Sequence, residues 1–166
     1  LLEKKKENSL TINRESISAG FARVNWPGRF EIIQKSPLII IDSAHNQDSA
    51  LRLRLAMDDY LNGKPIVLLF GSSEDKDVRG MYSHLLPRVK TLVATRSTHP
   101  RAMEPNLLVE LANQFAKHAI ETQTIEEGLN EAIKQAGKDA AIMVTGSIFV
   151  AAAVRDLITN NSSIKL

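Results

Sequence analysis

Apolar residues in this chain form short continuous runs that alternate with longer amphipathic segments. Three of the runs, Leu38–Ile41, Ile66–Phe70 and 140–144, are apolar at every position. Strands that helices cover on both faces have this character, whereas half-exposed antiparallel strands alternate apolar and polar residues. Each run is followed by a segment of helix length, as a right-handed crossover between parallel strands requires. The pattern predicts a doubly wound α/β fold with helices on both faces of a mostly parallel sheet.

The segment after the first run has the clearest helical periodicity. A helix that begins at Asn46 or Gln47 places five apolar side chains on one face, namely Ala50, Leu53, Met57, Tyr60 and Leu61. Asn62-Gly63 is a typical end for such a helix. The same reasoning predicts helices at 78–86, 104–118, 125–135 and 148–158, and further strands at 29–34, 89–95 and 119–122.

The first predicted strand, 29–34, is joined to Leu38–Ile41 by Lys35-Ser36-Pro37. Proline fixes φ and lacks an N–H group, so this tripeptide is typical of a tight turn. A turn of two or three residues is too short for a parallel crossover. We therefore expect the N-terminal strand to be antiparallel to its neighbour.

The first 25 residues lack this regularity. Leu1–Ser9 is polar and rich in lysine, and the apolar positions from 12 to 24 are scattered. Residues 1–29 hold six Lys and Arg against three Asp and Glu, whereas residues 30–166 hold 15 against 16. We interpret 1–25 as a linker with room for one short helix, 26–159 as the α/β domain and 160–166 as a tail.

Length and composition exclude several classes of protein. A chain of 166 residues suits one domain of ordinary size, and the absence of cysteine excludes disulfides and Cys-ligated metals. No apolar run approaches the roughly 18–20 residues that span a bilayer, and no apolar segment follows Lys4–Lys6 as in a signal peptide. A formal charge of +2 disfavours a bulk nucleic-acid binder. We expect a cytoplasmic protein, with which the lack of cysteine is compatible.

Polar, charged and small residues are concentrated where the predicted strands end. They form four segments, 42–46, 71–77, 95–101 and 145–147. In an open parallel sheet, ligands bind beyond the carboxyl ends of the strands. Turns alone require fewer residues of this kind, so we expect a binding site at this edge of the sheet.

Asp42 and His45 flank the first of these turns. A carboxylate at position 42 can accept hydrogen bonds from a ribose hydroxyl or from metal-bound water, and an imidazole at a helix N-terminus can meet an anion. The alternative is that Asp42 accepts hydrogen bonds from the turn backbone and that His45 is solvated. No third ligand at a telling spacing supports a metal site.

Three further candidates occupy the other strand ends. Lys76, between two aspartates, either faces a substrate carboxylate or belongs to a solvated helix cap. Arg101 follows a proline and suits bidentate recognition of carboxylate or phosphate, although a surface arginine has the same local sequence. Ser147 follows Gly146 at the start of a helix, where it serves as an N-cap or contacts an anion.

Several common motifs are absent. The sequence has no G-x-x-x-x-G-K-[ST] and no G-x-G-x-x-G, so other groups must hold most of the phosphates of any nucleotide. It also lacks the G-x-S-x-G elbow of a hydrolase triad.

Two motifs in succession carry a family resemblance. They are Trp26-Pro27-Gly28-Arg29-Phe30-Glu31 and Asp42-Ser43-Ala44-His45-Asn46, and they are followed by Asp-Lys-Asp at 75–77, Pro-Arg-Ala at 100–102 and Thr-Gly-Ser at 145–147. In this order the chain, from about residue 17 to 158, resembles the C-terminal domain of folylpolyglutamate synthase/dihydrofolate synthase, a branch of the Mur ligase superfamily with a Rossmann-like C-terminal domain. Ser43 departs from the glycine usual in that family.

The resemblance implies an ATP-dependent amide ligase. ATP phosphorylates a folate-type carboxylate, and L-glutamate attacks the acyl phosphate. The substrates implied are L-glutamate and a folate or dihydropteroate, with no nucleic-acid or membrane partner. ATP and Mg²⁺ would be bound mainly by a missing central domain, to which residues 1–25 connect. We therefore expect the 166-residue chain alone to be inactive, with no metal ligands of its own.

The resemblance also assigns roles to six residues. ATP contacts are implied for Arg29 at a phosphate, Asp42 at the ribose and His45 beside the phosphates. Glutamate contacts are implied for Lys76 and Ser147, with Arg101 as a further candidate. None of them is assigned as a catalytic residue. Two alternatives stay open, the corresponding domain of a peptidoglycan-precursor Mur ligase and a non-catalytic α/β binding module.

Overall fold

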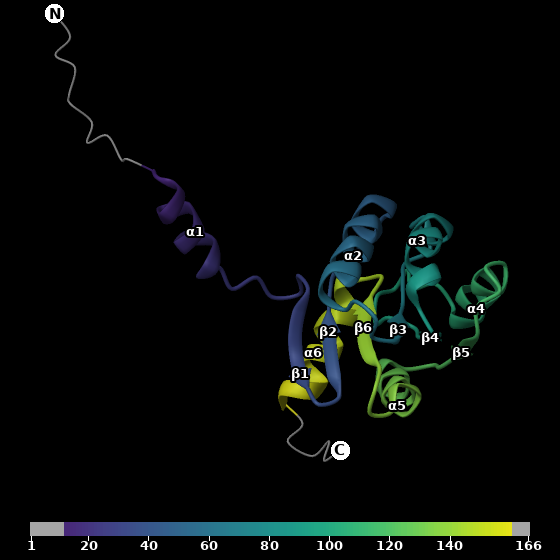
Figure 1. Cartoon of the computed structure of the whole chain (residues 1–166). Coiled ribbons are helices and arrows are strands. Elements are labelled where there is room, and N and C mark those ends of the chain that lie inside the picture. Colours follow the sequence, from purple (N-terminus) through teal and green to yellow (C-terminus); the bar gives the residue numbers. More distant parts are fainter. Residues whose placement is uncertain (1–11, 161–166) are drawn as a thin grey trace, which may run out of the picture.

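A single mixed sheet forms the centre of the molecule (Figure 1). The structure, a computed structural model, describes residues 12–160, and within that range six strands pair in the order β1-β2-β6-β3-β4-β5. Their bounds are Glu31–Lys35 for β1, Leu38–Ile41 for β2, Ile66–Phe70 for β3, Thr91–Ala94 for β4, Ala119–Glu121 for β5 and Ala141–Thr145 for β6. β1 and β2 are antiparallel and all other pairs are parallel, which confirms the predicted sheet.

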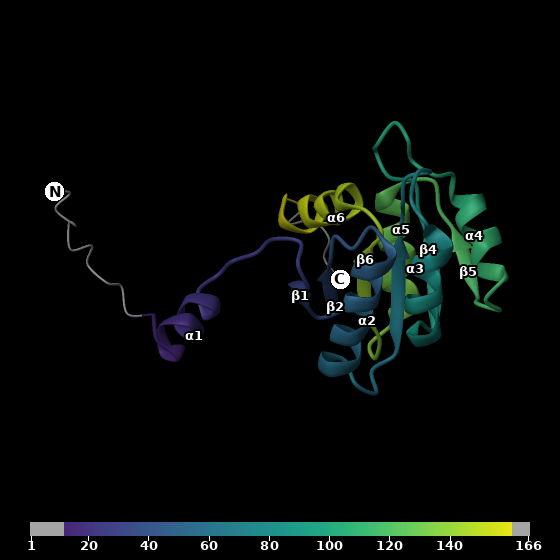
Figure 2. The ribbon, with the colours of Figure 1, turned by 90° about the horizontal axis from the view of Figure 1, so that it is seen from above.

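Helices cover both faces of the sheet. On one face α2 (Gln47–Tyr60), α3 (Val78–Leu85) and α4 (Pro105–Asn113) enclose one apolar core, and on the other α5 (Ile125–Ala136) and α6 (Ile148–Asn160) enclose a second. Figures 1 and 2 show α6 beside β1 and β2 at one end of the sheet and α4 beside β5 at the other. The doubly wound architecture is confirmed.

The central strands are apolar on both faces because both faces are covered. Every residue of β3 and of β6 is buried. The hydrogen-bond ladder continues one residue past the strands, since Asp42 N–H donates to Val144 O (2.9 Å) and Thr95 N–H to Phe70 O (2.9 Å). The loops after β2, β6, β3 and β4 therefore leave the sheet side by side at its carboxyl edge.

Two helical predictions were wrong in detail. The helix predicted over 104–118 ends at Asn113, because the chain turns there and Ala116 has a φ of 51°, outside the helical region. Tyr60, predicted on the buried face of α2, is the last residue of that helix and is 76% exposed. Its ring lies 5.6 Å from that of Phe30.

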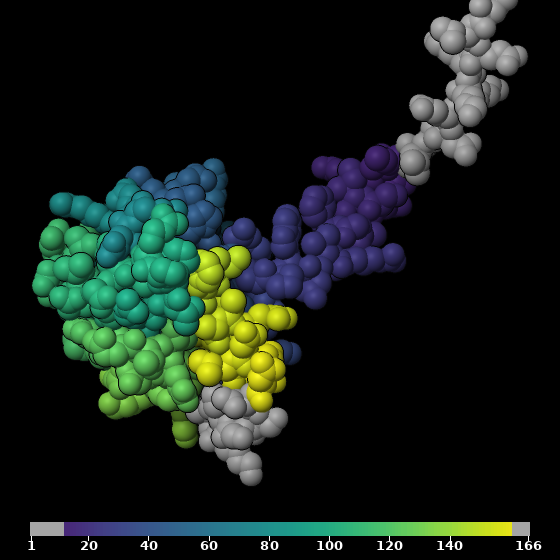
Figure 3. Space-filling model, turned by 180° about the vertical axis from the view of Figure 1, so that it is seen from behind, coloured from purple at the N-terminus to yellow at the C-terminus, as the bar shows by residue number. Residues whose placement is uncertain are grey.

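The predicted linker contains one short helix, α1 (Arg14–Ala22), which projects away from the domain (Figures 1 and 3). None of its residues is buried, and Ile17 and Phe21 are exposed. The lysine-rich start and residues 161–166 of the expected tail lie outside the described residues. Between residues 12 and 160, no helix combines the length and apolar character needed to cross a membrane.

Arg88, in the short 3-10 helix η1 (Leu86–Arg88), joins the end of α2 to the turn after α3. Its guanidinium donates to Leu61 O (2.6 Å) and Lys64 O (3.2 Å) and pairs with Asp58 (3.2 Å). Its side chain is 19% exposed. We expect Arg88→Met to lower the free energy of unfolding by about 2 kcal/mol in chemical denaturation, because these acceptors lose their donor.

Arg52 provides the matched control. Its side chain is 73% exposed, and its ion pair with Asp48 is long, at 3.9 Å. Arg52→Met is expected to change the free energy of unfolding by less than about 0.5 kcal/mol. Equal losses in the two variants contradict the role given to Arg88.

Candidate functional site

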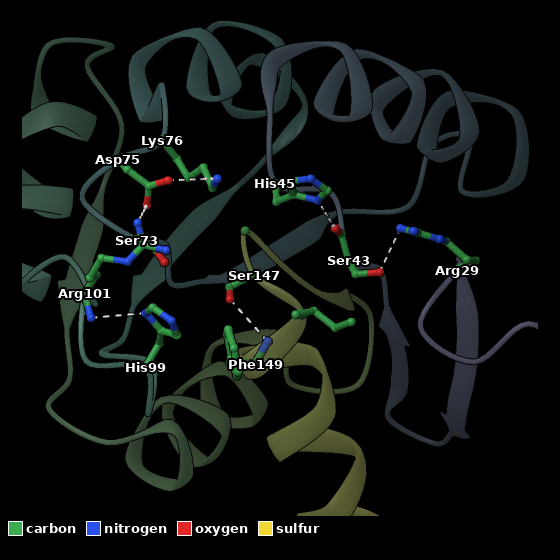
Figure 4. Close-up of a pocket in the computed structure, with 12 residues that line it drawn as sticks. Arg29, Ser43, His45, Ser73, Asp75, Lys76, His99, Arg101, Ser147 and Phe149 are labelled. Atoms are coloured by element: carbon green, nitrogen blue, oxygen red, sulfur yellow. Dashed lines mark hydrogen bonds and ion pairs between the residues drawn. The ribbon is translucent and has the colours of Figure 1, made fainter.

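The loops at the carboxyl edge surround a pocket of about 240 Å³ (Figure 4). Five of the six residues singled out in the sequence line it, namely Arg29, His45, Lys76, Arg101 and Ser147. Arg29 comes from the turn before β1, and the other four come from the loops that follow β2, β3, β4 and β6. The lining is completed by Ser43, Ser73, Asp75, His99, Gly146, Ile148 and Phe149.

Local structure fixes the loop after β2. Asn46 is the N-cap of α2, where its side chain accepts from Ser49 N–H (2.8 Å) in a capping box. Ala44 O accepts hydrogen bonds from Gly146 N–H (3.0 Å) and Thr145 Oγ1 (3.3 Å). This loop is therefore fastened to the loop after β6, which brings His45 and Ser147 to the same pocket.

Glycine at position 146 allows the loop after β6 to approach the loop after β3 closely. Gly146 has a φ of 99°, and a Cβ there would lie 2.6 Å from Gly71 O. Ser147 follows, and its Oγ accepts from Phe149 N–H (3.2 Å) at the start of α6. Ser147 thus acts as an N-cap and also borders the pocket, so both interpretations of this residue fit the geometry.

Arg29 is held by a residue that the sequence reasoning did not select. Its Nη1 donates to Ser43 Oγ (2.8 Å), and Ser43 Oγ in turn donates to Gly28 O (2.8 Å). Ser43 is 4% exposed, so this chain of hydrogen bonds is largely shielded from water. The serine that departs from the family pattern thus orients the guanidinium at the pocket wall.

The hydrogen bond of His45 determines which ring nitrogen carries a proton. Its Nδ1 lies 3.0 Å from Ser43 O, and a carbonyl oxygen only accepts, so Nδ1 must donate. In the neutral ring, Nε2 is then the acceptor. His45 can therefore take a proton at Nε2 or, once protonated, attract an anion.

Asp42 does not line this pocket. Its Oδ2 accepts from Phe30 N–H (2.9 Å) and its Oδ1 from Ala44 N–H (2.8 Å), as in the structural alternative considered for this residue. Burial raises the pKa of Asp42, an effect opposed by these two hydrogen bonds and by the charge of Arg29. With Arg29 and Arg52, Asp42 lines a neighbouring groove of about 270 Å³.

Charge and aromatic contacts organise the opposite wall. Lys76 and Arg101 both lie near Asp75. The ring of His99 lies 4.7 Å from that of Phe149, and His99 Nδ1 accepts from Arg101 N–H (3.1 Å). In Figure 4, Arg29 and Ser43 lie on one side of Ser147, and Asp75, Lys76 and Arg101 lie on the other.

Sequence reasoning overlooked Ser43, Asp75, His99 and Phe149 as pocket residues. Three of them lie in the strand-end segments already singled out, so the strand-end rule was the available signal. Phe149 belongs to an apolar helix, and its sequence gave no reason to place it at a site. Within residues 12–160, no three His, Asp or Glu side chains are grouped to hold a metal ion.

The arrangement suits the binding of anionic groups. Three cationic side chains from separate segments, Arg29, Lys76 and Arg101, border one small pocket with the N-terminus of α6. Guanidinium and ammonium groups hold carboxylates and phosphates through charge-assisted hydrogen bonds.

Known proteins share this sequence pattern and fold. The family model described as Mur ligase, glutamate ligase domain, matches residues 28–148. The chain is 30% identical over 145 residues to a probable bifunctional folylpolyglutamate synthase/dihydropteroate synthase of Haloferax volcanii, and the alignment covers 87% of this chain and 17% of that protein.

Two solved structures extend the likeness. Escherichia coli FolC in complex with DHPP and ADP superposes with a TM-score of 0.83 at 25% identity, over 93% of this chain and 36% of that one. A bifunctional folylpolyglutamate synthase/dihydrofolate synthase with Mn, AMPPNP and L-glutamate bound has a TM-score of 0.77 at 26% identity, over 90% and 36% of the two chains. This chain thus spans little more than a third, or less, of the length of these proteins.

Proposed function

Because this chain belongs to the Mur ligase family as its glutamate ligase domain, we propose that it forms the amino-acid-binding part of an ATP-dependent ligase that adds L-glutamate to a folate or dihydropteroate. The observation that carries the proposal is the convergence of these side chains on one pocket, with Lys76 and Arg101 on one side, Arg29 on the other and Ser147 between them. A structural relative with L-glutamate bound supports the choice of amino acid. The relatives are described as folylpolyglutamate synthases, which favours a folate over a peptidoglycan precursor as the acceptor substrate.

The two sides of the pocket suit the two halves of such a reaction. In the first half, a carboxylate oxygen of the folate would bond to the γ-phosphorus of ATP while the bond from that phosphorus to the β-phosphate oxygen breaks, which gives an acyl phosphate and ADP. Mg²⁺, when bound, would neutralise part of the phosphate charge. The glutamate nitrogen then bonds to the acyl carbon, the bond from that carbon to the phosphate oxygen breaks, and the nitrogen gives up a proton. Catalysis of this kind depends on positioning and on electrostatic stabilisation.

Each side chain has a defined part in the proposal. Lys76, Arg101 and the hydroxyl of Ser147 bind the carboxylates of glutamate and so orient its amino group. Arg29, fixed by Ser43, stabilises negative charge on the phosphoryl oxygens. His45 lies at the same pocket, where its charged form attracts the phosphates.

Asp42 contributes first through the backbone. Its hydrogen bond to Phe30 N–H fixes the residue that follows Arg29. The ribose contact that the family resemblance implies requires the nucleotide to approach from the neighbouring groove, which Asp42 and Arg29 both line.

Residues 1–25 form, in this proposal, the junction with the ATP-binding central domain of a longer protein. The family model begins at residue 28, so α1 precedes the matched domain. The exposed Ile17 and Phe21 of α1 are then available to pack against that domain. Most contacts with ATP and Mg²⁺ are assigned to the same central domain.

The function is tested with the full-length protein. We expect ADP release from MgATP to depend on L-glutamate and on either dihydropteroate or tetrahydrofolate, with a glutamylated product in mass spectrometry. Products from muramyl peptides instead support the peptidoglycan branch. Absence of turnover with every acceptor supports a non-catalytic module and contradicts the proposal.

A further inference from the structure

Two loops of the pocket are joined to each other by their backbones. Glu74 N–H donates to Arg101 O (3.0 Å), and Met103 N–H donates to Ser72 O (2.9 Å). Between these bonds, Ser73 and Ala102 form an isolated antiparallel bridge. The loops after β3 and β4 therefore form one wall, and Asp75 and Arg101 face each other across it.

A single carboxylate connects the two cations of this wall. Asp75 Oδ2 lies 3.0 Å from Lys76 Nζ, and Asp75 Oδ1 lies 3.7 Å from Arg101 Nη1. Among the residues that line the pocket within the described part of the chain, Asp75 is the only acid. The same lining contains three cationic residues, Arg29, Lys76 and Arg101.

We propose that Asp75 is the positioning residue of the amino-acid pocket: it holds Lys76 and Arg101 at a spacing that receives a dicarboxylic amino acid, and its negative charge weakens the binding of inorganic oxyanions. This inference rests on the proposed function for its substrate, but the geometry and the charge count stand without it. Asp75 acts through the two cations and does not touch the reacting atoms.

The charge balance explains both parts of the proposal. When Asp75 is ionised, its carboxylate orients Lys76 and Arg101. The two oriented cations can then bind the two carboxylates of the substrate at fixed positions. Without it, three unopposed cations border a pocket of about 240 Å³, which favours small multivalent anions such as sulfate or phosphate. The hydrogen bond from Lys76, aided by the charge of Arg101, lowers the pKa of Asp75, so the side chain is ionised at neutral pH and is a poor proton acceptor.

Steady-state kinetics of the full-length ligase test the positioning role. We expect Asp75→Asn to raise the KM for L-glutamate about tenfold with kcat nearly unchanged, since two partly exposed ion pairs of ordinary strength are lost. Competitive inhibition by sulfate should strengthen severalfold at the same time. Asp75→Glu keeps the negative charge, so its KM and its sulfate inhibition should lie closer to those of the wild type than the values of Asp75→Asn do. A purely structural defect at this position would not depend on whether the replacement carries the charge.

Glu74→Gln is the matched control. It removes the same charge one residue earlier, its side chain is exposed and outside the pocket lining, and its backbone bond to Arg101 is retained. We expect wild-type KM and wild-type sulfate inhibition in this variant. Equal glutamate KM values, or equal sulfate inhibition, in the Asp75→Asn and Glu74→Gln enzymes overturn the proposal.

A second measurement separates this inference from the proposed function. The thermal unfolding midpoint of the 166-residue chain is recorded with increasing sodium sulfate, with sodium chloride at matched ionic strength as reference. Sulfate should raise the midpoint more in Asp75→Asn than in Glu74→Gln, because a ligand that binds the folded state stabilises it. An equal rise in both variants rejects the charge argument, whereas loss of glutamate-dependent turnover in the wild-type ligase rejects only the proposed function.

Discussion

Replacing Arg29 with alanine in the full-length ligase is expected to lower kcat by roughly 10²–10³-fold, the usual cost of removing a donor that stabilises transition-state charge. The guanidinium is already fixed by Ser43 Oγ at 2.8 Å, so little reorganisation is needed when phosphoryl charge develops. Removing it raises the barrier to phosphoryl transfer more than it weakens the binding of glutamate. Initial rates at saturating ATP, folate and glutamate measure the effect.

Two further variants make the Arg29 result specific. Arg29→Lys keeps the charge but loses the planar fork, so an intermediate rate is expected. Arg79→Ala removes an exposed arginine on α3, outside the pocket lining, and should keep the wild-type rate. A wild-type rate in Arg29→Ala removes the proposed role of this residue.

Gly146→Ala is expected to have the largest effect on stability, a loss of about 2–6 kcal/mol. The φ of 99° is strained for any residue with a Cβ, which costs about 1–3 kcal/mol. The added Cβ would also lie 2.6 Å from Gly71 O and 2.7 Å from the Phe70 ring, and overpacking of this kind costs a further 1–3 kcal/mol or so. Chemical denaturation of the 166-residue chain measures the loss.

Gly20→Ala is the control for glycine replacement. Gly20 lies in α1, a Cβ there meets nothing within 4 Å, and alanine favours helix by about 1 kcal/mol over glycine. This variant should be as stable as the wild type or slightly more so. If Gly146→Ala unfolds within about 1 kcal/mol of the wild type, the close approach of the loops after β3 and β6 is not required by the fold.

The sheet and the place of the site could be predicted because both depend on local patterns. Ile66–Phe70 and the run before Thr145 are apolar throughout, and such strands must be covered on both faces. Their order in a parallel sheet then determines that the segments after them lie at one edge. Four of the pocket residues, His45, Lys76, Arg101 and Ser147, were selected in this way, by position more than by residue type. Arg29 came from the family motif alone.

Contacts between distant loops could not be predicted. The backbone hydrogen bond between Glu74 and Arg101 and the tilted contact of the His99 and Phe149 rings join segments whose relative positions no periodicity reveals. The role of Asp75 depends on the first of these contacts. Asp42 presents a different problem, because its local sequence fitted either a ligand contact or a role as acceptor for backbone N–H groups. Only the structure shows that its carboxylate accepts two backbone hydrogen bonds.

A crystal structure of the full-length ligase with a nonhydrolysable ATP analogue, Mg²⁺ and L-glutamate tests the assignment of the pocket most directly. We predict that the glutamate carboxylates lie within hydrogen-bond distance of Lys76, Arg101 and Ser147, with Asp75 still between the two cations. Glutamate bound elsewhere in the protein, with these three side chains in contact with solvent alone, would contradict the assignment.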